Sequence, residues 1–494
     1  MGAELQVHTS EHDVTARRTS SRARLCAALA LLGATTLACG DDAVGQTDAA
    51  SAGTQGGSGS AAGSSSDSAA SETQGGGGTE TGGMTTAPAT SEVSTAGPTT
   101  DDATTMGAEP KFDVGGAADF PGVDCDCGMA SEFSYIWVAN SPESTVSKID
   151  TQTVEEVGRF VTKPDLNGNP SRTSVSISGR KVAVANRHGG VIAIWANEAD
   201  CDPDQNGAPG LQTSTDAVAL PWDQDDCVAW YTPFDDWTVQ RPIAWAPGVF
   251  NEVTCQWEDE RVWSAGCGGG SMPGFGSGAT TVVRLDGDTG EIVDQLVMDS
   301  YSCGGFGPYG GAVDSAGNFW MTLNNGPLGF VDAETLEWTI HDKPSDVASY
   351  GLTVDSAGRP WVTSYSQSVG VARFDPMTET WATTGELVGY SQSGIAQGSD
   401  GRLWIAGTFN GTSGIASLDP ETLAVIDILG GTSSGKGVSG DGDGYIWRAG
   451  GSMATRFNPD DGTFTTYQGL NAAYTYSDMT GFGVANASGC QPAG

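Results

Sequence analysis

Basic residues are scarce in this chain of 494 residues. It contains 22 Lys and Arg against 61 Asp and Glu, which gives a formal net charge of −39. Contacts to nucleic-acid phosphates need clustered Lys and Arg, so the composition argues against a nucleic-acid partner. The acidic excess favours solubility outside the cell over an acidic recognition surface.

Histidine is scarcer still, with four residues, of which only His188 and His341 lie in the part expected to fold. The sequence also lacks a Gly-x-Ser-x-Gly elbow, a phosphate-binding loop and a zinc-binding helix motif. His188 is the best single candidate for a general base. Its alternative role is that of a polar turn residue that donates to a backbone carbonyl. We expect His341 on an outer connection, in contact with solvent.

The apolar run near the N-terminus, residues 25–32, is too short to span a bilayer. Arginines precede it and Ala38-Cys39 follows, an order typical of export signals. This end resembles a bacterial lipoprotein signal, which implies that Cys39 is lipidated. We therefore expect residues 1–38 to be a signal peptide, and the protein to be lipid-anchored at the bacterial outer membrane or cell surface. The alternative is an exported chain without a lipid.

Large apolar residues are nearly absent from residues 39–111, which are rich in Gly, Ser and Thr. Such a segment buries too little surface to offset the entropy of ordering, so it is expected to be a disordered tether. The folded part is predicted to be residues 112–494.

The folded part contains eight cysteines, an even number that fits disulfides formed in an oxidising compartment. The spacing in Cys125-Asp126-Cys127 is not that of a zinc knuckle. Connectivity is not fixed by spacing alone. The preferred pairs are Cys201 with Cys227, Cys255 with Cys267, and Cys490 with Cys125 or Cys127.

One unit recurs along the second half of the chain: an apolar strand, an Asp- and Gly-containing turn, and a strand that carries Trp. The tryptophans are 41, 43 and 43 residues apart, a period that fits one four-stranded antiparallel blade of a propeller. Each Trp is expected to pack against the neighbouring blade. The four tryptophans are Trp320, Trp361, Trp404 and Trp447.

The same pattern predicts an all-β, seven-bladed propeller, with six or eight blades as alternatives. The first strand of the folded part, residues 135–140, matches the second strand of the repeat. We therefore expect residues 480–486, near the C-terminus, to supply the innermost strand of the first blade and close the ring. A long insertion, at about residues 200–240, follows the third strand of the second blade.

These repeats, with Gly-x-Asp-Gly-x-x-Trp at residues 398–404, resemble the streptogramin lyase (virginiamycin B lyase) family and related NHL-type propellers. The resemblance covers residues 131–490, most clearly 308–467. It implies the propeller fold, and in that family a magnesium-dependent lyase that uses His and Glu. The positions at which that family typically carries Glu contain none in this chain, so no catalytic residue is carried over. Those positions are Asn140, Leu323, Ser364, Gly407 and Gly450.

Tyrosines precede several predicted innermost strands, and polar turns should converge on the same mouth of the ring. Tyr and Asn in a concave site suit a small polar ligand, such as a glycan or a peptide, and packing of the rim is the alternative. The candidate ligand-binding residues are Arg187, His188, Tyr309, Asn324, Tyr350, Tyr365, Phe409 and Tyr476.

Oxygen-bearing side chains alternate in the insertion at Asp202, Asp204 and Asn206, and Gly207 follows. This spacing matches the opening of an EF-hand loop and predicts a structural calcium ion, with a plain turn as the alternative.

Together these patterns favour an exported, tethered and monomeric propeller that binds a ligand or a protein without catalysis. A lyase with a rebuilt site and a surface scaffold are the alternatives.

Overall fold

A computed structural model describes residues 134–487, apart from 252–253, 255, 325, 348, 366–369, 432–434 and 477. These residues lie within one compact unit, Ala108–Gly494. None of the helices in the described part is long and apolar enough to cross a membrane. The predicted signal peptide, the lipidation of Cys39 and the tether lie outside the described residues.

Seven antiparallel sheets form the blades of a β-propeller, as predicted. The first three blades hold β1 (Tyr135–Asn140), β2 (Thr145–Asp150) and β3 (Glu156–Val161); β4 (Pro170–Val175), β5 (Lys181–Asn186), β6 (Val191–Trp195) and β7 (Val228–Thr232); β8 (Val239–Ala246), β11 (Arg261–Cys267), β12 (Ala279–Asp286) and β13 (Ile292–Ser302). A separate hairpin pairs β9 (Val249–Asn251) with β10 (Gln256–Glu258). Short 3-10 turns occupy η1 (Ser141–Glu143) and η2 (Glu198–Asp200).

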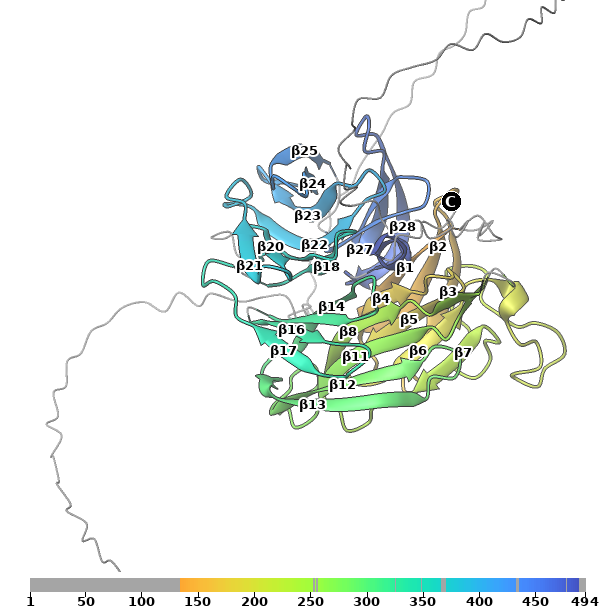
Figure 1. Cartoon of the computed structure of the whole chain (residues 1–494). Helices are drawn as coiled ribbons and strands as arrows, with labels where there is room; N and C mark the ends of the chain where they lie inside the picture. Colours follow the sequence, from red (N-terminus) through yellow and green to blue (C-terminus); the bar gives the residue numbers. More distant parts are fainter. Residues whose placement is uncertain are drawn as a thin grey trace, which may run out of the picture. The chain divides into compact units, whose positions relative to one another are not determined.

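The remaining four blades follow the Trp repeat. They hold β14 (Pro308–Val313), β15 (Phe319–Leu323), β16 (Leu328–Val331) and β17 (Trp338–His341); β18 (Leu352–Val354), β19 (Pro360–Val362), β20 (Ala372–Asp375) and β21 (Thr380–Thr383); β22 (Ser391–Gln397), β23 (Leu403–Phe409), β24 (Thr412–Leu418) and β25 (Val425–Gly430); β26 (Gly437–Gly440), β27 (Ile446–Phe457) and β28 (Phe464–Ala473). In Figure 1, β4, β8, β14, β18 and β22 lie toward the middle of the ring, and β7, β13, β17, β21 and β25 lie at its rim.

Each repeated Trp is tied to the Asp of the preceding turn. In the fifth blade, the Asp355 carboxylate accepts from the backbone N–H groups of Ala357 and Arg359, and from Nε1 of Trp361 at 2.8 Å. The same indole-to-carboxylate bond joins Trp320 to Asp314, Trp404 to Asp400 and Trp447 to Asp441. One Asp therefore shapes the turn and satisfies the buried indole N–H, which explains why the two residues recur together.

The tryptophans fill the space between blades, as predicted. Trp404 is fully buried, and it packs against Val438, Ile446 and Phe457 of the seventh blade. Glycine lets the innermost strands approach closely, because a Cβ on Gly394 would lie 2.5 Å from the carbonyl oxygen of Lys436. The core is therefore a series of similar packing interfaces, one between each pair of neighbouring blades.

The C-terminal segment closes the ring, although not as the predicted strand. Tyr474 donates its backbone N–H to Ala139 of β1, and Trp137 of β1 donates to Met479. Residues 474–479 thus lie beside the first blade. The prediction of a strand at residues 480–486 is wrong, because Phe482–Ala487 form the short helix α1. The Asp478 carboxylate accepts from the backbone N–H groups of Gly481, Gly483 and Val484, which turns the chain into that helix.

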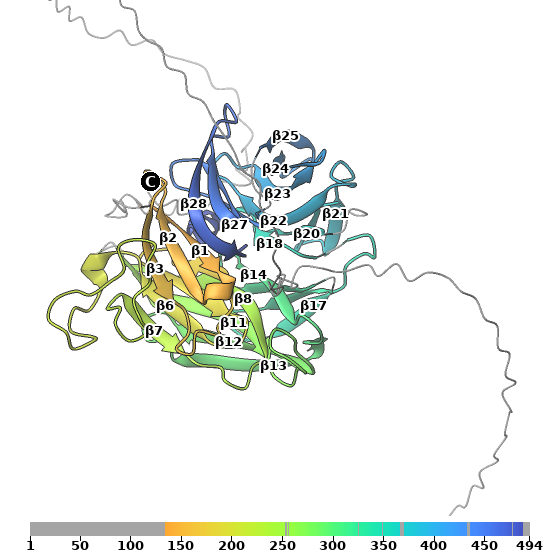
Figure 2. The ribbon, with the colours of Figure 1, turned by 180° about the vertical axis from the view of Figure 1, so that it is seen from behind.

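Two disulfides lie in the described part, Cys201–Cys227 and Cys267–Cys303. The first confirms a predicted pair and closes the insertion, which lies at the outer edge beside β7 (Figures 1 and 2). The second corrects the predicted Cys255–Cys267 pair. Cys267 ends β11 and Cys303 follows β13, so the blade brings together two residues far apart in sequence. Disulfides indicate an oxidising, exported location. Cys125, Cys127, Cys255 and Cys490 lie outside the described residues.

Asp441, the Asp that pairs with Trp447, provides a pH-dependent test of the burial of these turns. Burial raises its pKa from 3.8 to about 6, while the bonds from Trp447 and Tyr445 oppose that rise. A raised folded-state pKa adds stability that is complete below pH 3.8 and is lost as pH rises through 6. We expect Asp441→Asn to remove a dependence of about 2–3 kcal/mol between pH 4 and pH 7. Denaturant unfolding at both pH values measures it, and a difference between wild type and variant that does not change with pH would contradict the burial of this carboxylate.

Candidate functional site

Aromatic side chains from several blades meet where the innermost strands begin. Tyr309 lies at the start of β14 and Tyr350 just before β18, while Tyr476 comes from the closing C-terminal segment. These three are buried against one another, and Phe306, Tyr365 and Tyr474 pack on them, partly exposed. We call these six residues the tyrosine cluster. Its members come from three separate parts of the chain, residues 306–309, 350–365 and 474–476, which the closed ring brings together.

The hydroxyl of Tyr474 lies among the other hydroxyls of the cluster. Its oxygen is 2.8 Å from that of Tyr309, 2.7 Å from that of Tyr350 and 3.2 Å from that of Tyr476. Burial raises the pKa of Tyr474 and of Tyr476 well above the usual value of 10. The phenols of Tyr474 and Tyr476 therefore stay neutral near pH 7 and contribute no negative charge to the site.

Basic side chains surround the cluster from other blades. The guanidinium carbon of Arg172, at the start of β4, lies 3.3 Å from the ring centroid of Tyr476 and 5.0 Å from that of Tyr309. Arg241, at the start of β8, lies 5.2 Å from Tyr309, and Lys436, just before β26, lies 4.2 Å from Tyr365. A protein with few basic residues thus places several of them beside the tyrosine cluster, where the innermost strands begin.

Arg172 is the most unusual of these residues. It is fully buried, and its Nη1 donates to the carbonyl of Ser171 at 2.8 Å. In the described part of the chain, its Nε and Nη2 have no hydrogen-bond partner, and no ion pair involves it. Stacking on tyrosine offsets only part of the cost of burying a charge. Two donors of a buried cation thus have no acceptor among the described residues, and charged acceptors form the strongest hydrogen bonds with such groups.

The structure brings together five of the eight predicted ligand-binding residues. Tyr309, Tyr350, Tyr365 and Tyr476 belong to the tyrosine cluster, and the guanidinium carbon of Arg187 lies 4.5 Å from the ring of Tyr474. Sequence reasoning proposed no binding role for Arg241, Lys436 or Tyr474. Arg241 lies near the start of β8 at the position equivalent to Tyr309 of β14, so an alignment of strand starts across all blades could have found it.

The other three predicted residues do not belong to the tyrosine cluster. The Nδ1 of His188 is 2.8 Å from the carbonyl oxygen of Asn167, an acceptor, so the ring nitrogen donates as a turn residue would. Burial lowers the pKa of His188, which keeps the ring neutral near pH 7. Phe409 is buried and packs edge-on against Tyr390, and Asn324 follows β15, partly exposed.

His341 also differs from its prediction. It is only partly exposed, because its ring lies 4.7 Å from that of Phe374 and 5.8 Å from that of Trp320. It therefore packs within the fourth and fifth blades.

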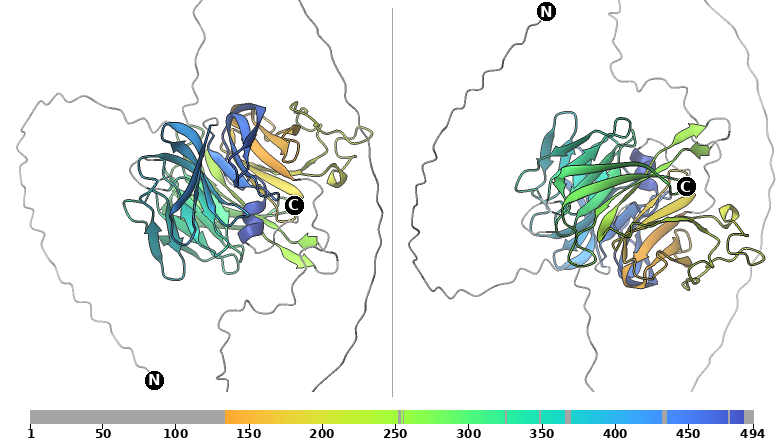
Figure 3. Two further views of the ribbon diagram at one scale, coloured as in Figure 1. Left: turned by 90° about the horizontal axis from the view of Figure 1, so that it is seen from above. Right: turned by 90° about the horizontal axis from the view of Figure 1, so that it is seen from below.

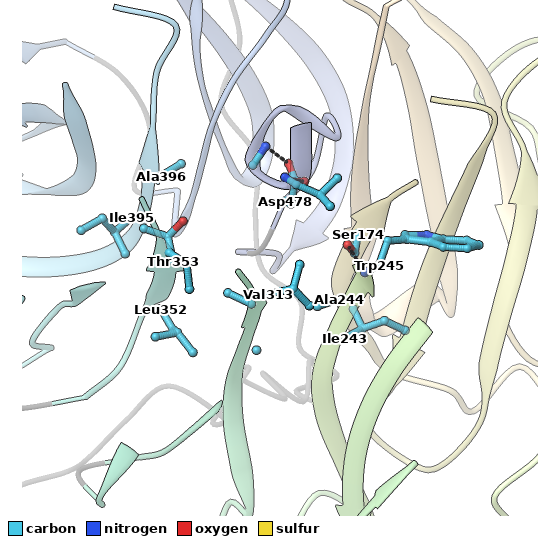
Figure 4. Close-up of a pocket in the computed structure, with 15 residues that line it drawn as sticks. Ser174, Ile243, Ala244, Trp245, Val313, Leu352, Thr353, Ile395, Ala396 and Asp478 are labelled. Carbon is cyan, nitrogen blue, oxygen red and sulfur yellow. Dashed lines mark hydrogen bonds between the residues drawn. The ribbon is translucent and has the colours of Figure 1, made fainter. Parts of the chain in front are cut away.

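A cavity between the innermost strands of several blades has a mainly apolar lining. Figure 4 shows Ile243 and Ala244 of β8, Val313 of β14 and Ile395 of β22 around the cavity, with Asp478 beside it. The cavity volume is about 40 Å³, room for only a few waters. Helix α1, which contacts the innermost strands of four blades and is visible in Figure 3, narrows this cavity. Burial raises the pKa of Asp478 despite its hydrogen bonds to backbone N–H groups.

The predicted calcium loop has the geometry of a turn. Asp202 accepts from the backbone N–H of Asp204, and Asn206 accepts from that of Ala208. The side-chain amide of Asn206 donates to Gln224. No group of three or more His, Cys, Asp or Glu side chains suited to a metal occurs among the described residues. Calcium at this loop stays a prediction.

Comparison with known proteins gives structural neighbours only. No family model matches the chain, and no curated protein matches it by sequence. A streptogramin B lyase structure is 16% identical, covering 61% of this chain and 83% of its own, with a TM-score of 0.40. Virginiamycin B lyase from Staphylococcus aureus is 14% identical, covering 64% and 92%, with a TM-score of 0.42.

A functionally unknown protein from Desulfotomaculum acetoxidans is 9% identical, covering 70% of this chain and 98% of its own, with a TM-score of 0.45. Such distant similarities carry no information about activity. The assignment of this chain as a seven-bladed β-propeller therefore rests on the seven sheets of its own structure.

Proposed function

We propose that this protein is a binding module, and that the tyrosine cluster with its surrounding basic residues takes a small polar ligand bearing an anionic group. The buried Arg172, with two unpartnered nitrogens in the described structure, is the observation that carries the proposal. A carboxylate placed there would accept charge-assisted hydrogen bonds. An acidic glycan or an acidic peptide has this chemistry.

The surrounding residues suit such a ligand. The tyrosines offer ring faces and hydroxyl donors, and Arg187, Arg241 and Lys436 add positive charge near the same cluster. The partial exposure of Phe306, Tyr365 and Tyr474 gives the cluster a side that faces solvent. The site thus combines aromatic surface with convergent polar groups, the usual composition of a ligand pocket.

A lyase with a rebuilt site is the alternative function. Elimination needs a base near the proton that it removes. Among the described residues, His188 is hydrogen-bonded to Asn167. Asp478 is hydrogen-bonded to the backbone at the start of α1. These two residues therefore do not form a His–carboxylate pair with each other. The basic side chains around the tyrosine cluster would stabilise the negative charge that develops in an elimination. A ring-opening assay with a cyclic depsipeptide tests this alternative.

The wider setting belongs to the same proposal. Lipidation at Cys39 and a tether over residues 39–111 would hold a monomeric propeller near the bacterial outer membrane or cell surface. Calcium at Asp202, Asp204 and Asn206 would stiffen the insertion. A surface scaffold that binds other proteins is the remaining alternative.

An array of glycans and peptides in acidic and neutral forms tests the binding function. We expect the bound members to carry carboxylate, sulfate or phosphate groups, and Arg172→Gln to lose them. Arg172→Lys should recover part of the signal because it restores the charge. Arg402→Gln, which removes an arginine that pairs with Asp400 in the sixth blade, is the matched control.

Retention of all bound members by a folded Arg172→Gln variant would contradict the role of Arg172. Binding by neutral members alone would contradict the anionic ligand. Depsipeptide ring opening by the wild type would replace the binding function with the lyase.

A further inference from the structure

A second cavity lies on the outer side of the second blade, between the insertion and β7. Its volume is about 190 Å³. It shares no residue with the tyrosine cluster, and the insertion that forms one wall lies at the periphery in Figure 3. The lining residues that matter below are Gln205, Trp222, Asp223, Asp225, Trp230 and Tyr231.

Aromatic rings form much of the wall and are held in place. The ring centroids of Trp222 and Tyr231 are 5.3 Å apart with an interplanar angle of 81°. The indole of Trp230 is fixed by a 3.0 Å hydrogen bond from Nε1 to the carbonyl of Gly287. Such a preformed arrangement lowers the ordering cost of binding.

The insertion is fastened to the blade next to this cavity. The Cys201–Cys227 disulfide closes it, and the Gln205 side-chain amide donates to Val228 of β7 at 2.9 Å. Asp225 is buried, and its carboxylate accepts from the Thr213 hydroxyl and from the backbone N–H groups of Ser214 and Cys227. These contacts fix a carboxylate in the cavity wall.

Most residues that line the cavity come from a segment whose charged residues are all acidic. Residues 189–240 contain ten Asp and Glu and no Lys, Arg or His. Asp223 is exposed on the cavity lining, so its carboxylate is available to a ligand that enters from solvent. The faces of aromatic rings are negative, so rings and carboxylates here attract the same kind of ligand.

We propose that this cavity binds an organic cation, an alkylammonium head group that contacts Trp222 and Tyr231 and is attracted by Asp223 and Asp225. Its volume is below the roughly 300–1,000 Å³ of pockets for drug-sized ligands, which favours a single head group over an oligosaccharide. The site is independent of the anionic ligand at the tyrosine cluster.

Choline and its neutral isostere 3,3-dimethylbutanol are the probes, titrated into the full chain and followed by tryptophan fluorescence and NMR. They have nearly the same shape and differ in charge. A cation–π contact of about 1 kcal/mol corresponds to about a fivefold difference in Kd, so we expect choline to bind at least about fivefold more tightly. Raising the salt concentration should weaken choline binding more than binding of the isostere.

Variants locate the site. Trp222→Ala should abolish the preference for choline, and Asp223→Asn should reduce it. Trp381→Ala, at a partly exposed Trp of the fifth blade, and Asp216→Asn, at an exposed Asp of the same insertion that does not line the cavity, are the matched controls. Both controls should bind choline as the wild type does.

Equal affinity of the wild type for choline and the isostere would overturn the proposal, as would the absence of choline binding by folded protein. Choline binding that survives in a folded Trp222→Ala variant would place the cation elsewhere and overturn it too. The wild-type comparison keeps the test decisive if Trp222→Ala fails to fold.

Discussion

Deletion of residues 478–494 is expected to prevent formation of a soluble folded monomer. The deletion removes Met479, which accepts a hydrogen bond from Trp137 of β1, and the helix α1 that contacts four innermost strands. It also removes the buried side chains of Phe482 and Val484. The first blade would then expose an unpaired strand edge in a ring that no longer closes, and such edges promote association.

Size-exclusion chromatography and thermal unfolding measure this effect. Deletion of residues 491–494 alone is the matched control for truncation, and we expect it to behave as the full chain. Unchanged melting and monomeric elution of the longer deletion would show that the C-terminal segment does not close the ring.

Trp404→Ala is expected to lower the free energy of unfolding by about 3–5 kcal/mol, as truncations of buried aromatic residues do. Trp404 is fully buried between the sixth and seventh blades, and its Nε1 donates to Asp400. Removing the ring leaves a cavity between the two blades, and the Asp400 carboxylate loses one donor while it keeps its bonds from Arg402.

Denaturant unfolding measures this loss. Trp381→Ala is the control, because Trp381 lies partly exposed on β21 at the rim, and we expect it to cost much less. A loss below about 1 kcal/mol for Trp404→Ala would contradict the burial of this residue in the interface between the sixth and seventh blades.

The repeat explains how far the fold could be predicted from sequence. Trp at a regular period, preceded by an Asp turn, sets strand order within a blade, so the seven blades and the packing of Trp404 followed from local patterns. The C-terminal segment carries a similar pattern of residues, but Asp478 takes three backbone N–H groups and starts a helix. The helix therefore depends on how Asp478 is placed in the folded ring, which the match between two short sequence patterns does not reveal.

The site was harder to predict for the same reason. Tyr309 and Tyr350 stand at the start of Trp-containing repeats, where the pattern is clear. Arg172 and Arg241 begin blades in which that repeat is weak, so only an alignment of strand starts would reveal them. Cys303 was assigned no partner, since Cys255 is closer to Cys267 in sequence and blade geometry brings Cys303 to it instead. Contacts between distant segments carry no periodic signal.

The proposal that Arg172 and the tyrosine cluster bind an anionic ligand is tested most directly by the affinities for matched acidic and neutral forms of one ligand. The ligand is the strongest acidic member from the array, compared with its own amide by titration calorimetry on the wild type and on Arg172→Gln. Hydrogen bonds to a charged group are worth about 1.5–3 kcal/mol, so we expect the acid to bind the wild type about 10- to 100-fold more tightly than the amide. The variant should lose most of this preference, and Arg187, Arg241 and Lys436 would account for the part that remains. Equal binding of acid and amide by the wild type would contradict an anion site at Arg172.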